Sequence, residues 1–536
     1  MRRLAGLVVG GLLLHLVLIL PNRPAAMGWA AMWQMPLELP LILFALAAVT
    51  GRAFVLRIVL VALLTLICLL KLADFGNYIA YNRMFNPATD LGLIRAAFDL
   101  GIGSLGPLLG LIAALAAVLV PVLIAALLWW ATGRWARVSL PVLWRSAAAL
   151  ISLAALALVA GQIGAAKRFW TMPVTTPGTA LTTRLAYDRV ELFRITRAEL
   201  VSFVAAAQSD PFAAASPLLD RLGDKDVVFI FIESYGRASF DNPLYAPTHG
   251  ATLQVAEAEL GAIEGVTMRS GWMTAPIIGG QSWLAHTSVA SGLWISDQIR
   301  YRALLASPRK TLFDLARAAG YHTTTVVPAI TRDWPEGSRI GFETILASDD
   351  LGYAGLPFNW VTMPDQFTLA AYDRLLAKAP RDGRPLFSEI SLISSHAPWV
   401  PVPQMIGWED VGDGTVFNEM AQSDDPPNVV WQDHERVRDQ YRQAIDYALQ
   451  ASLSYVGQQG EDMPLFIILG DHQAAAFVSG SDSFDVPVHV IGPSDLVSMT
   501  GQWGWTPGLV PDDSLPAWSM DLFRDRFLRA FSTGVP

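Results

Sequence analysis

The chain has 536 residues, of which 53% are hydrophobic and 16% charged, with a formal net charge of −9 at pH 7. This composition is too apolar for a wholly soluble protein of this length and too acidic for a typical nucleic-acid-binding protein. Cys68 is the only cysteine, which excludes an intramolecular disulfide as well as a cysteine-based metal site or cysteine nucleophile in the globular part.

Hydrophobic segments fill most of the first 165 residues. Five of them are long enough to span a bilayer, since a spanning helix needs roughly 17 to 25 residues. They are residues 4–20, 27–49, 54–73, 105–131 and 143–165. The second segment contains Gln34, Glu38, Pro36 and Pro40, so a shorter or re-entrant element is the alternative there. The sequence therefore predicts a five-helix transmembrane region over residues 1–165.

Basic residues predict the orientation of these spans. Five spans place Arg2, Arg3, Arg52, Arg134 and Arg137 on one side of the membrane. The positive-inside rule makes that side cytoplasmic. We therefore expect a multi-pass protein of the bacterial inner (cytoplasmic) membrane, with an uncleaved N-terminal anchor and with the chain after residue 166 in the periplasm or outside the cell.

Two connecting regions separate the spans from each other and from the globular part. Residues 71–104 contain Tyr, Asn and Arg and a Phe-Asn-Pro turn, which favours an interfacial loop with a short helix; a plain connection is an equal alternative. Residues 166–225 mix Arg, Phe and small residues and are expected to form a linker with some helix. A globular catalytic domain is then expected over residues 226–536.

Short apolar runs in this domain predict buried strands. They cover residues 226–233, 387–393, 464–470 and 486–491, and helical periodicity appears between them, for example over residues 441–456. Strands that alternate with helices imply an α/β domain with a mostly parallel central sheet. Ligands of such sheets bind beyond the carboxyl ends of the strands.

Polar residues stand at those strand ends. Glu233 ends the first run, and Asp471 and His472 follow the run 464–470. Two carboxylates and an imidazole suit a divalent ion such as Zn²⁺ or Mn²⁺. Taken alone, Glu233 could equally cap a helix or form a salt bridge, whereas an adjacent acid and imidazole at a strand end rarely serve packing.

The stretch GGQSWLAH, residues 279–286, places Ser282 behind a Gly-Gly step. Glycines let the backbone approach a ligand, and a helix start offers N–H groups to an anion. A hydroxyl beside a divalent ion loses its proton more readily and becomes a nucleophile. Ser282 is therefore the predicted nucleophile and a metal-ligating group. A helix N-cap role is the alternative, and Thr274, Ser288 and Ser291 are competing hydroxyls.

Four motifs carry a family resemblance. FIESYGR, GGQSWLAH, SSHAPW and LGDHQ, in that order behind the hydrophobic segments, resemble the lipoteichoic acid synthase and phosphoglycerol or phosphoethanolamine transferase branch of the sulfatase and alkaline phosphatase superfamily. The resemblance covers about residues 220–500, and the ordered combination is more specific than any single motif. It implies an outward-facing sulfatase-like domain behind a membrane anchor.

The resemblance also implies roles for single residues. Glu233, Ser282, Asp471 and His472 would bind the catalytic metal, as one or possibly two ions, and Ser282 would take up the headgroup phosphate. His396, in SSHAPW, would contact the phosphate or act as acid or base; a buried structural histidine is the alternative. Phosphate contacts of the family are matched by Trp334 with Arg332 or Arg339, although their spacing differs. Arg237 and Arg269 would hold phosphate or form surface pairs. His286 and His489 would be structural or complete a second metal site, and His489 is also a candidate substrate contact.

Three departures from the family pattern narrow the activity. Ser282 stands where the best-known members carry Thr, and the same chemistry is open to Ser. The residues after Ser282 lack the x-Pro-x-Arg pattern of true sulfatases, which disfavours sulfate ester hydrolysis. Phosphoethanolamine transferases often carry outside disulfides, which this chain cannot form, so phosphoglycerol transfer is favoured.

The sequence thus predicts a metal-dependent transferase that moves a phosphoglycerol or phosphoethanolamine headgroup through a phospho-serine intermediate. Its donor would be a membrane phospholipid, and its acceptor an envelope glycan or lipid. A membrane-anchored phosphodiesterase or phosphatase that uses water is the alternative, and a non-catalytic envelope sensor is the third hypothesis. The sequence does not indicate an oligomeric state.

Overall fold

The computed structural model describes residues 2–49, 53–81, 83–91, 107–172, 176–332, 334–460 and 463–535. The chain divides into two compact units, Met1–Ala198 and Glu199–Pro536. The division falls inside the 27-residue helix α8 (Leu181–Ala207), which lies within the predicted linker. Each unit is described by itself.

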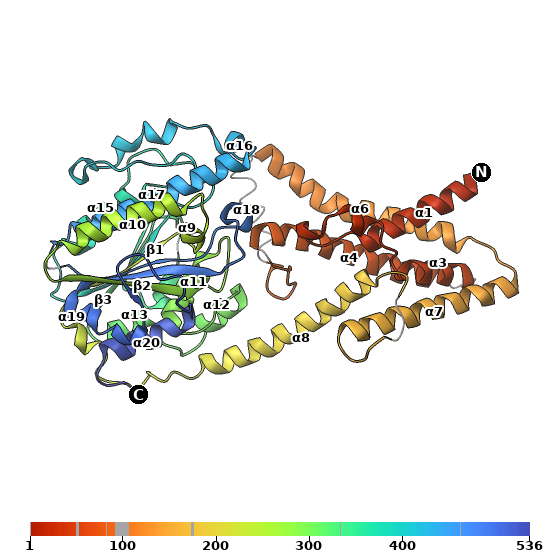
Figure 1. Ribbon diagram of the computed structural model, residues 1–536, viewed down its shortest axis with the longest axis horizontal. Coiled ribbons are helices and arrows are strands. Elements are labelled where there is room, and N and C mark those ends of the chain that lie inside the picture. The colour runs from red at the N-terminus through yellow and green to blue at the C-terminus, as the bar shows by residue number, and fades with distance from the viewer. Residues whose placement is uncertain are drawn as a thin grey trace. The chain divides into compact units, whose positions relative to one another are not determined.

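Apolar helices build the first unit (Figure 1). They are α1 (Arg2–Ile19), α2 (Trp29–Met32), α3 (Glu38–Ala48), α4 (Ala53–Tyr81), α6 (Pro107–Ala136) and α7 (Val142–Ala166), followed by the start of α8. Among the described residues, four stretches are long and apolar enough to cross a membrane: Arg2–Ile19, Ala53–Tyr81, Ala114–Ala136 and Val142–Ala166. The chain is therefore a multi-pass membrane protein with four candidate spans.

Residues 27–49, the second of the five predicted spans, do not form one long helix. That segment forms α2 and the 11-residue α3, and at 1.5 Å per residue α3 is about 16 Å long, roughly half of a hydrocarbon core. Its polar residue has a structural role, because the buried Glu38 accepts hydrogen bonds from the backbone N–H and hydroxyl of Thr183 at 2.8 and 3.0 Å. The shorter element that the sequence allows for this segment is the one observed.

Side-chain contacts show which helix ends lie together in this unit. The Trp135 indole at the end of α6 donates to the Leu7 carbonyl near the start of α1, at 3.1 Å. At the other end of α1, the Leu18 carbonyl accepts from the Lys71 ammonium of α4 at 3.2 Å and from the Thr182 hydroxyl of α8 at 2.6 Å. The start of α1 and the end of α6 thus lie at one end, and the start of α8 lies at the opposite end.

The predicted interfacial loop 71–104 is only partly described. Helix α4 continues through Tyr81, so the first part of this region is helical. Residues 92–106 lie outside the described residues, as does Arg52.

A nine-stranded sheet forms the centre of the second unit. The strands are β1 (Val227–Ile232), β2 (Val266–Thr274), β3 (His322–Val327), β4 (Thr344–Ala347), β5 (Leu386–Leu392), β6 (Leu465–Gly470), β7 (Asp485–Pro493), β8 (Thr506–Pro507) and β9 (Trp518–Ser519). Their order is β4-β3-β5-β1-β6-β7-β2-β8, with β9 beside β2. Strands β4, β3, β5, β1 and β6 are parallel, whereas β7 runs antiparallel to both of its neighbours. The predicted α/β domain with a mostly parallel sheet is confirmed.

Helices cover both faces of this sheet (Figure 1). They are α9 (Ala238–Asp241), α10 (Ala246–Gly261), α11 (Ser282–Ser291), α12 (Gln298–Leu305), α13 (Leu312–Ala318), α14 (Glu336–Ile340), α15 (Asp365–Tyr372), α16 (Pro427–Val430), α17 (His434–Gly457), α18 (Ala476–Ser479), α19 (Ser494–Ser498) and α20 (Phe523–Phe531).

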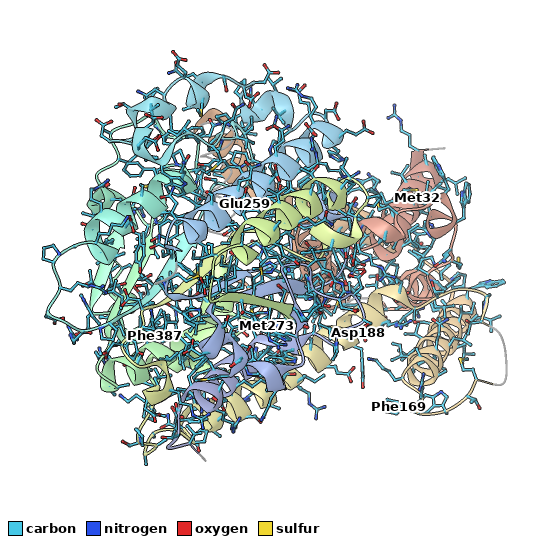
Figure 2. All side chains as sticks on the ribbon, turned by 60° about the vertical axis from the view of Figure 1, so that its left-hand side comes forward. Met32, Phe169, Asp188, Glu259, Met273 and Phe387 are labelled. Carbon is cyan, nitrogen blue, oxygen red and sulfur yellow. The ribbon has the colours of Figure 1, made fainter. Side chains whose placement is uncertain are left out.

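Two hydrophobic cores result from this arrangement. Helices α10, α15 and α17 pack on one face and α11, α13 and α20 on the other. In Figure 2, Met273 of β2 and Phe387 of β5 mark the sheet, and both contribute to the core under α20. Alternate residues of β1 enter opposite cores, Ile230 and Ile232 the first, Phe229 and Phe231 the second. The buried strand is therefore apolar along its whole length up to Glu233.

Candidate metal and phosphoryl-transfer site

The pairing register of β1 and β6 brings the predicted carboxylates to the same level, at the carboxyl ends of these strands. Strand β1 pairs with β6 in parallel, and Ile232 lies opposite Gly470. The residues that follow, Glu233 and Asp471, therefore leave neighbouring strands together. Gly470 is required at this point, because a Cβ there would lie 1.8 Å from the carbonyl oxygen of Tyr235 in the adjoining turn.

Glu233, Asp471 and His472 form a compact buried group. One ligand atom from each lies within 4.8 Å of the others, and their exposures are 7%, 1% and 1%. The Nε2 atom of His472 is 3.1 Å from Glu233 Oε1. Asp471 Oδ1 accepts hydrogen bonds from the backbone N–H groups of Ser234 and His472 at 2.8 and 2.6 Å. This group could bind a metal ion, as its composition predicts.

The His472 ring is oriented for such a role. Its Nδ1 atom lies 3.0 Å from the carbonyl oxygen of Gln473, and because a carbonyl only accepts, Nδ1 must carry the hydrogen. The lone pair of a neutral ring is then on Nε2, which faces Glu233. A second hydrogen bond that fixes the tautomer is the usual support of a metal-binding histidine.

Ser282 joins this group from the other side. Its hydroxyl donates to Glu233 Oε2 at 2.7 Å and lies 3.3 Å from His472 Nε2. Ser282 is the first residue of α11, and positive φ angles at Gly279, Gly280 and Gln281 (74°, 133° and 69°) turn the chain sharply before it. The N–H of Gly279 donates to the Gln473 carbonyl at 2.9 Å, which ties this turn to the Asp-His pair.

The competing hydroxyls are bonded elsewhere. Thr274 donates to Asp485 at 2.7 Å, and Ser288 donates to the carbonyl of Leu284 at 2.7 Å. Ser291 is buried and accepts from the N–H of Leu293. Of the four hydroxyls considered, the structure brings Ser282 to the acidic group.

Charges in the group are strongly coupled. Burial raises the pKa of Asp471 to about 7, and the negative charge of Glu233 adds to this shift. Burial opposes protonation of His472, but the two carboxylates outweigh it and raise its pKa to about 9. Burial likewise opposes ionisation of Glu233, but the cationic His472 lowers its pKa well below the usual range, and His396 contributes. In the metal-free state a proton on His472 therefore balances the acids, a role that a divalent cation can take over.

His396 faces the same group. It follows β5, and its charge acts on Glu233. Its Nδ1 atom is bonded to the carbonyl oxygen of Ala397, so Nδ1 carries the hydrogen and Nε2 remains the proton-accepting atom of the neutral ring. The ring stacks on the Trp360 indole with centroids 4.1 Å apart. Ser395, beside it, donates to the Glu233 carbonyl at 2.7 Å.

Two other predicted residues, Arg237 and His489, are bonded to partners outside this group. Arg237 is bonded to Asp241, Asp485 and the Asp513 carbonyl and lies over Trp272. His489 is fully buried in β7 between the Ser270 and Tyr235 hydroxyls, at 2.8 and 3.2 Å. Burial lowers its pKa to about 3, so its ring is neutral. Trp334 packs near Phe342, and Arg332 is exposed in the preceding turn.

His286 forms a partly buried pair with Glu389. Its Nδ1 atom is 3.2 Å from Glu389 Oε1, and its ring stacks on Phe231 at 3.8 Å. It lies one turn after Ser282 on α11, and its bond to β5 anchors the helix that carries Ser282.

Three neighbours of the site were not found from the sequence: Trp360, Ser395 and Asp365. The buried Asp365 accepts from the N–H groups of Ile393 and Ser394, both at 2.8 Å, and so holds the segment that leads to His396. Burial raises its pKa to about 6. Its position at the start of α15 was the available signal, whereas no sequence pattern links Trp360 to His396.

Comparison with known proteins matches this domain to one family model. The family model described as Sulfatase matches residues 225–484. No curated protein matches the chain in sequence.

Solved structures are similar to part of this chain at low identity. The lipoteichoic acid synthase LtaP from Listeria monocytogenes is 12% identical, with 55% of this chain and 71% of that chain covered and a TM-score of 0.35. The C-terminal periplasmic domain of EcEptC from Escherichia coli is 11% identical, with 56% and 80% covered and a TM-score of 0.36. The phosphoglycerol transferase GacH from Streptococcus pyogenes, in complex with sn-glycerol-1-phosphate, is 12% identical, with 62% and 91% covered and a TM-score of 0.33.

Proposed function

We propose that the domain matched by the Sulfatase family model, residues 225–484, transfers a phosphoglycerol or phosphoethanolamine headgroup from a membrane phospholipid to an envelope glycan or lipid. One observation carries the proposal: the hydroxyl of Ser282 enters a buried Glu-Asp-His group at a helix start, 2.7 Å from Glu233. A nucleophile, a cation site and helix N–H groups for an anion thus converge.

Glu233, Asp471, His472 and Ser282 would hold one divalent ion, Mn²⁺ or Zn²⁺. When bound, the ion lowers the pKa of a neighbouring hydroxyl and stabilises charge on phosphoryl oxygens. Ser282 Oγ then attacks phosphorus, the bond between phosphorus and the diacylglycerol oxygen breaks, and the headgroup phosphate remains on Ser282. Diacylglycerol leaves with a proton, and the serine hydroxyl has lost one.

His396 is suited to proton transfer at both stages. Since its Nδ1 hydrogen is bonded to the Ala397 carbonyl, Nε2 is the atom that exchanges protons. A protonated ring donates to the departing diacylglycerol oxygen, and the neutral ring then accepts the proton of the acceptor hydroxyl. That hydroxyl attacks the phospho-serine, and the Ser282 oxygen regains its proton.

The helix ends of the first unit support an outward-facing domain. Arg134 and Arg137 adjoin the end of α6, which contacts the start of α1, where Arg2 and Arg3 stand. The start of α8 lies at the opposite end of the unit. If the arginine-rich end is cytoplasmic, the chain leaves the membrane on the periplasmic or extracellular side. Phospholipid headgroups of that leaflet would be within reach.

A Ser282→Ala variant tests the nucleophile. We expect it to lose diacylglycerol release from phosphatidylglycerol by about three orders of magnitude or more, because the covalent step is removed. Ser282→Thr, which retains a hydroxyl, should keep part of the activity, and Ser288→Ala on the same helix is the matched control. Substantial transfer by the folded Ser282→Ala protein would contradict the assignment.

Water as acceptor is the second candidate function, favoured by the same nucleophile and base. Product analysis with and without a sugar acceptor separates the two, because a hydrolase releases free glycerol phosphate at an unchanged rate when the acceptor is present. A non-catalytic envelope sensor is the third hypothesis; a protein without stoichiometric metal, insensitive to Glu233→Ala and Asp471→Ala, would support it. Phosphate contacts by Arg237, Arg332, Trp334 and His489 stay predictions.

A further inference from the structure

Exposed aromatic side chains gather around the candidate site. Among the described residues of the second unit, the large aromatic side chains classed as exposed are Trp283, Trp360 and Trp431, at 42%, 45% and 41%. Exposed tryptophans on a folded domain are a signature of an interaction surface. We define these three, together with the exposed Leu356 and Val429, as the tryptophan rim.

Each tryptophan of the rim is attached to the site by a specific contact. Trp360 stacks on His396 at 4.1 Å. The Trp431 indole donates to the Pro398 carbonyl at 3.1 Å and stacks on Trp399, with centroids 5.8 Å apart and planes 7° from parallel. Trp283 directly follows Ser282, and its indole donates to Gln298 at 3.0 Å. The rim therefore borders the mouth of the site and is held in place by its neighbours.

Leu356 and Val429 extend the apolar character of the rim. Leu356 precedes Trp360 by four residues, and its N–H donates to Asn418 at 2.7 Å. Val429 lies in α16, two residues before Trp431. Their exposed fractions are 42% and 37%. Apolar surface from two separate segments is thus presented to solvent next to the rings.

A bilayer surface fits this rim better than a soluble partner. Amphipathic indole rings are favoured at the headgroup level of a membrane. The chain carries four candidate spans, so the domain is permanently held near a bilayer. In addition, the proposed donor is a phospholipid, whose phosphate lies at that same level.

We propose that the tryptophan rim docks on the bilayer surface and seats the mouth of the site at the depth of the lipid phosphates. The inference rests on the proposed function only for the identity of the donor. The segment 409–425, beside the rim in sequence, carries six acidic residues and no basic ones. Attraction between charges therefore does not drive the docking, and apolar insertion does, so docking persists at high salt.

Depth measurements on the full-length protein test the proposal directly. The chain has a single cysteine, so Cys68→Ala provides a background for single labels. Leu356→Cys, Val429→Cys and Trp431→Cys carry an environment-sensitive dye on the rim. Leu63→Cys on α4 is the membrane control, and Val255→Cys on α10 is the control exposed elsewhere on the domain. Both side chains are exposed on the surface of their own unit, at 51% and 59%.

The proteins are reconstituted in vesicles of phosphatidylethanolamine and phosphatidylglycerol that contain lipids with a quencher near the headgroup. We expect rim labels to be quenched at least half as strongly as the Leu63→Cys label, with no change in 0.5 M salt, and the Val255→Cys label to be unquenched. Rim labels that behave like the Val255→Cys label would overturn the proposal.

Two further arms separate this inference from the proposed chemistry. Quenching is measured again with Ser282→Ala, and it should be unchanged because docking needs no catalysis; docking without any lipid turnover would contradict the proposed function alone. Trp431→Ala should lower turnover of vesicle phospholipid relative to a water-soluble phosphodiester by about tenfold. A raised KM for the acceptor, with unquenched rim labels, would instead assign the rim to the acceptor glycan and overturn the membrane proposal.

Discussion

Metal binding at the Glu233, Asp471 and His472 group should displace protons. The pKa values of His472 and Asp471 determine how many protons are displaced at each pH. Without metal, burial and the two carboxylates place the pKa of His472 at about 9, and burial places that of Asp471 at about 7. Both groups must lose their protons before they can ligate a cation. Between pH 7 and 9 one proton competes with the metal, and below pH 7 two compete.

The magnitude follows from this count. Affinity should fall about tenfold from pH 8 to 7 and approach a further hundredfold from pH 7 to 6, which is a total of about 1,000-fold, or about 4 kcal/mol. The sign follows from proton competition, because acid favours the forms of both ligands that cannot bind a metal. Calorimetric titration of the metal-free protein with Mn²⁺, in buffers of different ionisation enthalpy, measures both the affinity and the protons released.

The proton count provides the refutation. We expect about one proton released at pH 8 and nearly two at pH 6. His322→Gln, a change at the start of β3, is the matched histidine control and should leave the count unaltered, whereas His472→Gln should remove about one proton and most of the affinity. An affinity independent of pH between 6 and 8 would refute this account of the ligand set.

Three further substitutions follow from the geometry. Asp365→Asn should keep the acceptor for the N–H groups of Ile393 and Ser394 and remove the burial of a charge. Because the pKa of Asp365 is raised to about 6, the wild-type protein loses stability as pH rises from about 4 to 6, by at most about 3 kcal/mol. Thermal unfolding of the variant should lack this loss. Gly470→Ala places a Cβ 1.8 Å from the Tyr235 carbonyl oxygen, so we expect a stability loss of about 2 kcal/mol or more and weaker metal binding. Denaturant unfolding and metal titration measure the two effects, and an unchanged stability and metal affinity would contradict the close approach. Trp360→Phe, which keeps a ring against His396, should retain more activity than Trp360→Ala, and a pH–rate profile of the two should shift only for alanine.

The site residues that directly follow buried strands could be predicted from the sequence. Apolar runs that stop at Glu233 and at the Asp471–His472 pair identified two neighbouring strands, and parallel pairing made their ends meet. Ser282 could be predicted because a Gly-Gly turn and a helix start lie together in the sequence. Buried-strand patterns gave β1, β5, β6 and β7, but the antiparallel direction of β7 depends on topology that hydrophobicity does not encode.

Other features depend on contacts between distant segments. Strand β3 was missed because its buried positions include Thr323, Thr324 and Thr325, which break the apolar run. The Thr323 hydroxyl donates to the Gly341 carbonyl, and the Thr324 hydroxyl donates to Ser388 of β5. The contact of Trp360 with His396 joins two loops. Residues 27–49 contain a short helix in place of one long helix, and the carboxylate of Glu38 at its start is bonded to Thr183 of α8, far along the chain.

The most direct test of the central claim is mass spectrometry of the purified, detergent-solubilised protein after incubation with phosphatidylglycerol or phosphatidylethanolamine and Mn²⁺. The account predicts a glycerophosphate or phosphoethanolamine adduct on the peptide that contains Ser282, absent from Ser282→Ala. Diacylglycerol release at full rate, with an adduct on another residue or with undiminished release by Ser282→Ala, would contradict it.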